Sequence, residues 1–117
     1  MKKNQKQFRQ GDVFLTPCPE VPADATVVPR DSGRVILAYG EVTGHCHAMV
    51  EPDVALLERE VTTPSGSKEK QMYLRVGAPK GSKLTHQEHS TVTVPPGTYT
   101  VVRQREYSRG EVRQVLD

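Results

Sequence analysis

Short apolar runs, rather than long amphipathic stretches, make up this chain. The runs are rich in valine, threonine, tyrosine and isoleucine, which are typical of a pleated sheet. Glycine, proline, aspartate and serine separate them and indicate turns. The pattern predicts an all-β fold, a small single-domain barrel or sandwich. The expected strands are residues 11–16, 25–29, 34–39, 45–51, 71–76, 90–95, 98–107 and 111–116.

Two further segments are less regular. Asp53 is a candidate helix cap for residues 54–60, but these residues also alternate as a strand does, and we favour the strand. Residues 62–70 contain no apolar side chain and include Pro64 and Gly66. They are therefore predicted to be a loop at the tip of a hairpin.

The charge of the 117-residue chain is nearly balanced, at +2. Basic side chains gather at the start, so we expect residues 1–10 to be a basic, flexible terminus and residues 11–117 to form a single β domain. A solvated terminus is the simpler interpretation, and a nucleic-acid or protein adaptor of a mobile element is the alternative. The polar hairpin expected at 101–115 is either an edge hairpin kept soluble by its charges or a basic-aromatic surface for phosphate or single-stranded nucleic acid.

The composition also bears on location. No apolar run approaches the ~20 residues that cross a membrane, and the charged start is not followed by the apolar segment of a secretory signal. Cys18 and Cys46 form no CxxC motif, which argues against a thiolate zinc site. We therefore expect a cytoplasmic protein with reduced thiols and no membrane contact.

The four histidines fall in two tight clusters, and the first is the more informative. Residues two apart on a strand face the same side, so His45 and His47 are expected to point together while Cys46 points away. Two imidazoles on one strand form half of a metal site. The spacing predicts a bound divalent metal ion.

His86 and His89 are expected to supply the other half of that site. They are three residues apart, and on a straight strand they would face opposite sides. Either a turn at residues 87–88 brings both to one side, or only one of them joins the first pair. His86 ranks slightly ahead, because it ends a plausible strand that begins at Ser82.

Three carboxylates lie near these clusters in the sequence. Glu51 shares the strand parity of His47, but on a straight strand their α carbons are about 13 Å apart, so Glu51 is the weakest candidate metal ligand. Glu41 and Glu88 are candidates for orienting a ligand imidazole or for acting as a general base.

His45, His47 and Glu51 together form HxH followed by Glu after three residues, which resembles the first metal motif of the cupins. Cupins are small β-barrels that hold a divalent metal with three histidines and a glutamate. Residues 94–99, VPPGTY, resemble the proline-glycine turn of the second cupin motif. The resemblance implies a cupin-like barrel. Because no histidine follows that turn here, it also implies that the second motif is rearranged.

A wider resemblance covers most of the chain. Residues 9–15, 33–48, 84–107 and 112–117 resemble a family of small uncharacterised bacterial and phage-like proteins with GExTGHxH, LxHxEH and QREY stretches. The resemblance implies that both histidine stretches belong to one unit. It implies no activity.

These features predict a small histidine-ligated metalloprotein. Imidazole ligands favour zinc, with iron, manganese, nickel and copper as alternatives. Three imidazoles leave a position for an activated water, which supports hydration or hydrolysis of a small-molecule substrate, including carbonic-anhydrase-like hydration of carbon dioxide. Four would instead close the site and make a structural or sensory metal module. A homodimer is compatible with a small β domain, although no sequence feature requires it.

Overall fold

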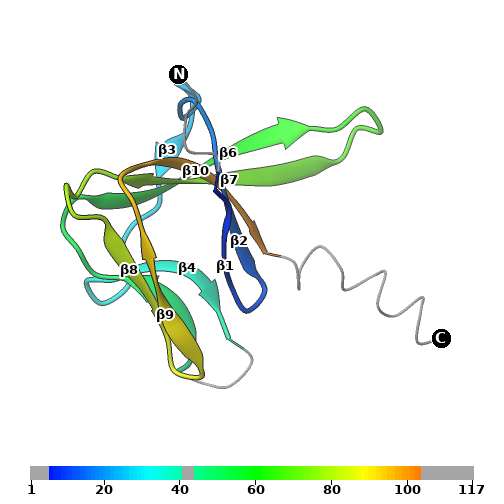
Figure 1. Ribbon diagram of the computed structural model, residues 1–117. Helices are drawn as coiled ribbons and strands as arrows, with labels where there is room; N and C mark the ends of the chain where they lie inside the picture. The colour runs from blue at the N-terminus through cyan, green and yellow to red at the C-terminus, as the bar shows by residue number, and fades with distance from the viewer. Residues whose placement is uncertain (1–5, 41–43, 104–117) are drawn as a thin grey trace.

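The computed structural model describes residues 6–40 and 44–103, which form ten strands and no helix (Figure 1). Hence no helix of these residues is long and apolar enough to cross a membrane. The strands are β1 (Phe8–Gln10), β2 (Val13–Pro17), β3 (Thr26–Val27), β4 (Val35–Tyr39), β5 (Cys46–Met49), β6 (Val54–Thr62), β7 (Lys68–Val76), β8 (Ser82–His86), β9 (His89–Val94) and β10 (Gly97–Arg103).

The strands form two antiparallel sheets. The larger has the order β1-β2-β10-β7-β6-β3, and the smaller has the order β4-β5-β8-β9. Alternate side chains of both sheets meet in one apolar core, which confirms the all-β prediction. The backbone ladders of the described residues do not close into a barrel. The largest fully buried apolar side chains are Leu15, Leu37, Met49, Leu56, Leu74 and Leu84.

The ambiguous segment at 54–60 is a strand. It lies in β6, which pairs with β7 from Val54–Val76 to Thr62–Lys68. The expected loop at 62–70 is a hairpin tip as predicted, but its bounds were wrong, because Thr62 and residues 68–70 belong to the ladder. Polar side chains are tolerated there because this hairpin projects into solvent beyond the other strands (Figure 1).

Residues expected to be a flexible terminus include strand β1. Phe8–Gln10 pair with Val13–Leu15 of β2, and the side chain of Gln10 is almost fully buried. The predicted boundary at residue 10 therefore falls inside a hairpin. The strand expected at 111–116 and most of the hairpin expected at 101–115 lie outside the described residues.

One arginine links loops on both sides of β4 and β5. The Arg30 guanidinium donates hydrogen bonds to the carbonyl oxygens of Gly33 (2.9 Å), Val50 (3.3 Å), Glu51 (2.5 Å) and Val54 (3.1 Å). The planar group presents five donors in a fixed fork, so one side chain can serve four carbonyls.

Arg30→Ala is therefore expected to lower the free energy of unfolding by about 1–2 kcal/mol, because partly buried carbonyls lose charge-assisted donors. Urea denaturation measures this loss. Arg59→Ala is the matched control, because Arg59 pairs with the exposed Asp24 at 3.2 Å and such surface pairs contribute about 0–1 kcal/mol. Equal losses in the two variants would contradict the role given to Arg30.

Candidate metal centre

All four histidines gather at one end of the smaller sheet. His47 lies in β5 and His45 immediately precedes that strand, while His86 ends β8 and His89 begins β9. Ala48 pairs with Thr85 in antiparallel register, which puts His47 opposite His86. His86 in turn pairs with His89. Three histidines therefore form one cross-strand row, and neighbours in such a row are in side-chain contact.

A turn at residues 87–88 separates His86 from His89, so the second cluster does not lie on one straight strand. It is a two-residue connection between β8 and β9. Gln87 supports it by accepting a hydrogen bond from the Cys46 backbone N–H at 2.9 Å. Both His86 and His89 consequently lie on the side of His47.

The imidazole rings are close enough to share an ion. Ring centroids are 4.3 Å apart for His47 and His86, 4.7 Å for His86 and His89, 5.8 Å for His47 and His89, and 5.9 Å for His45 and His86. Two imidazoles on one tetrahedral zinc ion have centroids about 5 Å apart. As they stand, no three His, Cys, Asp or Glu side chains of the described residues are positioned to hold an ion. Ligation therefore requires ring rotations.

The cluster runs from the interior to the surface. His47 is only 3% exposed, His45 and His86 are half-buried, and His89 is exposed. The row therefore has one anchored imidazole and an end open to solvent.

His47 is anchored by a residue that the sequence analysis did not identify. Gln10 Nε2 donates to the backbone oxygens of Leu84 (2.7 Å) and Ser90 (2.9 Å), which orients the amide and leaves Oε1 as the acceptor. That oxygen lies 2.8 Å from His47 Nδ1, so the imidazole donates from Nδ1. In the neutral ring the lone pair is then on Nε2, which lies 3.4 Å from Asp12 Oδ1.

Gln10 ends β1, and Asp12 lies within the β1–β2 connection at residues 11–12. Gly11 has φ +58°, as expected for glycine at the first central position of a tight hairpin turn. A glycine-aspartate pair between two strands was the available signal, but residues 11–16 were assigned to one strand. Asp12 was therefore interpreted as part of a strand rather than of a turn.

His86 is held in the opposite tautomer. Its Nδ1 accepts the Glu88 backbone N–H at 2.9 Å, so the neutral ring carries its proton on Nε2. Burial lowers the pKa of His86 below 6.5, and the neighbouring His89 and His45 lower it further. The Nδ1 lone pair of His86 is therefore already used by the turn.

His45 has a different environment. Within the part of the chain that the structure describes, its Nδ1 is buried and has no hydrogen-bond partner. The Glu88 carboxylate lies 3.5 Å from this nitrogen, within ion-pair range but without hydrogen-bond geometry. Glu88 is therefore beside the cluster, as an orienting residue would be. Glu41 lies outside the described residues.

Glu51 does not join the histidines. Its carboxylate accepts hydrogen bonds from the Ser82 hydroxyl and from the Lys83 backbone N–H, the latter at 3.4 Å. Ser82 begins β8 and His86 ends it, about 13 Å away. Burial alone would raise the pKa of Glu51, but the hydrogen bonds outweigh burial and lower it below 4.5.

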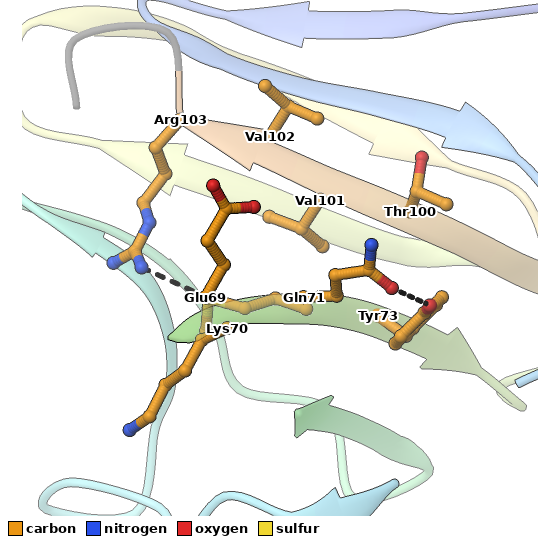
Figure 2. Close-up of a pocket in the computed structure, with 9 residues that line it drawn as sticks. Glu69, Lys70, Gln71, Tyr73, Thr100, Val101, Val102 and Arg103 are labelled. Carbon is orange, nitrogen blue, oxygen red and sulfur yellow. Dashed lines mark hydrogen bonds between the residues drawn. The ribbon is translucent and has the colours of Figure 1, made fainter. Parts of the chain in front are cut away.

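A groove of about 830 Å³ lies apart from the histidines, along β7 and β10 (Figure 2). Figure 2 shows the Tyr73 hydroxyl donating to the Gln71 side chain, at 3.0 Å. None of the four histidines lines this groove, so it has no imidazole ligand to offer. Its lining residues are Glu69, Lys70, Gln71, Met72, Tyr73, Thr100, Val101, Val102 and Arg103.

A family match covers residues 9–104, and so includes both histidine stretches and the Gly11–Asp12 turn. The chain belongs to the family described as Domain of unknown function (DUF8820). This agrees with the expected membership of an uncharacterised family. No curated protein and no solved structure matches the chain.

Glu51→Gln tests the hydrogen-bonded carboxylate. Because the folded-state pKa of Glu51 lies below 4.5, the ionised group stabilises the fold above that pH, and this contribution is lost as the pH falls through the folded value. Melting temperatures are expected to differ between wild type and variant at neutral pH and to converge in acid. Glu60→Gln, an exposed carboxylate of β6, is the control for loss of one charge. A constant difference at every pH would contradict the expectation.

Gly11→Ala tests the contact between the turn and the imidazoles. An added Cβ would lie 2.8 Å from His89 Nε2 and 3.2 Å from His47 Cε1. Gly33→Ala is the control, because Gly33 also has a positive φ but nothing within 4 Å of the added atom. Both variants are expected to lose about 1–2 kcal/mol of stability through backbone strain. Only Gly11→Ala should change the NMR signals of the His89 ring, and unchanged signals would disprove the contact.

Proposed function

We propose that the protein binds one divalent transition-metal ion through its histidine cluster. The observation that carries this proposal is the cross-strand row of His47, His86 and His89, with ring centroids 4.3–5.8 Å apart. Their stretches are separated by about a third of the chain, and strand pairing brings them into contact. The buried Nδ1 of His45, which has no hydrogen-bond partner among the described residues, adds a further nitrogen beside the row.

The donor chemistry favours zinc, with iron, manganese, nickel and copper as alternatives. Imidazole suits this group of ions. Cys46 is buried on the other side of its strand, where its sulfur accepts a hydrogen bond from Arg34 at 3.4 Å, so no thiolate of this strand is offered to the cluster. The cupin-like part of the proposal is limited to the HxH pair, because Glu51 is bonded elsewhere.

Solvent access favours a site that keeps a water molecule. His89 is exposed and His86 is half-buried, so one side of the row faces solvent. A divalent ion held there would activate water for attack, which is the chemistry of hydration and hydrolysis. The row itself would anchor the ion at the buried His47. A closed four-histidine site, acting as a structural staple of a cytoplasmic protein, is the competing form of this proposal.

Zinc titration of metal-free protein tests the proposal. We expect one zinc ion per chain by calorimetry and elemental analysis. At a hundredfold excess over the dissociation constant, bound zinc adds about 2.7 kcal/mol to stability, and a chelator removes the gain. His89→Ala is expected to weaken binding with little effect on the metal-free melt, because His89 is exposed. His47→Ala combined with His89→Ala should abolish binding.

Thr91→Ala, an exposed substitution on the same hairpin, should bind zinc as the wild type does. Circular dichroism of each metal-free variant separates loss of a ligand from loss of the fold. The proposal fails if metal-free wild type takes up no zinc, or if the double histidine variant binds as tightly as Thr91→Ala.

A further inference from the structure

The β1–β2 turn brings a carboxylate to the histidine cluster. Asp12 Oδ1 lies 3.4 Å from Nε2 of the buried His47, and the Asp12 side chain is 28% exposed. Gly11, the preceding residue, is packed so closely that an added Cβ would contact the rings of both His47 and His89. The turn is therefore part of the wall of the cluster.

The hydrogen bonds of Gln10 determine which ring nitrogen of His47 carries the lone pair, and so which atom faces the Asp12 carboxylate. The amide nitrogen of Gln10 is committed to two backbone oxygens, one in β8 and one in β9. Its oxygen must then accept from His47 Nδ1, at 2.8 Å. A neutral His47 directs the Nε2 lone pair toward Asp12 Oδ1. Two such electron-rich atoms attract each other only through a proton or a cation between them.

The separation of these two atoms suits a cation. With bonds of about 2.0–2.1 Å to each atom, a 3.4 Å gap corresponds to a bond angle of about 110°, which is near tetrahedral. A ligand imidazole is usually fixed by a second residue whose carboxylate or carbonyl oxygen accepts a hydrogen bond from the other ring N–H, as Gln10 Oε1 does for His47 Nδ1.

We propose that Asp12 is a carboxylate ligand of the centre and that Gln10 is the positioning residue that turns Nε2 of His47 toward the ion. This inference rests on the proposed metal-binding function and extends it to a mixed imidazole–carboxylate centre. His47, His89 and Asp12 form its core, with His45 as a further candidate donor. His86 packs against the other imidazoles but is not a ligand in this proposal, because its Nδ1 lone pair accepts the Glu88 backbone N–H.

The chemical consequence is the class of ion that the centre takes. Two imidazoles and one carboxylate with an open side accommodate zinc with a bound water, or ferrous iron. Imidazoles alone carry no compensating charge, whereas Asp12 contributes one negative charge to the site.

Asp12→Asn tests the ligand. Asparagine is accepted in tight turns, so the variant keeps the turn chemistry while losing the anionic donor. We expect zinc affinity to fall about 100-fold, and the visible absorption spectrum of the cobalt(II)-loaded protein to change in intensity and position. Asp24→Asn removes a surface carboxylate that pairs with Arg59, and it should leave both readouts unchanged.

Gln10→Leu tests the positioning role. Nitrogen NMR of the zinc-loaded wild type is expected to show His47 protonated at Nδ1, with Nε2 bound to the ion. The variant should show both tautomers and about a tenfold loss of zinc affinity. A cobalt spectrum of unchanged shape is expected here, because the ligand set stays the same.

The outcomes separate the two proposals. If the wild type takes up no zinc, both fail. If the wild type binds zinc, but Asp12→Asn binds equally tightly with an unchanged cobalt spectrum, only the role of Asp12 is overturned. Nitrogen shifts that show both His47 ring nitrogens protonated in the zinc-loaded protein would also overturn it, because the pair would then be joined by a proton.

Discussion

The buried amide of Gln10 is the contact on which the candidate centre depends. Gln10 lies in β1 at the edge of the larger sheet, and its hydrogen bonds reach β8, β9 and His47 in the smaller sheet. An amide so far from water must have its polar groups satisfied, and leaving one unpaired costs about 1–3 kcal/mol. These bonds join the two sheet edges, where the backbone ladders of the described residues do not meet.

The register of β8 against β5 is the second constraint. His47 and Met49 share a face of β5, and Leu84 and His86 share a face of β8. Met49 and Leu84 are buried in the core. A slip by one residue would expose Leu84 and turn His86 away from His47. The apolar contacts that stabilise the sheet therefore also position the histidine row, which lies at the boundary between the buried core and the surface.

Most strands could be predicted because alternation and turn residues are local signals. The strand at 54–60 was correctly favoured, since nine-residue pairing with β7 satisfies its backbone. The errors have a shared cause. Lys68–Lys70 and Phe8–Gln10 have strand conformation because a partner strand is present, and neither their composition nor their periodicity reveals that partner. Tertiary pairing overrides weak local preference at such positions.

The sequence by itself determined the strand character of the chain and predicted a common face for His45 and His47, because the side-chain period of a strand is two. Only the tertiary structure decided that a turn at 87–88 brings His86 and His89 to that face, and that Glu51 stays apart from them. It also decided the contacts of His47 with Gln10, 37 positions away, and of Gln10 with Leu84, 74 positions away. Such contacts depend on which strands pair, and no local pattern specifies that choice.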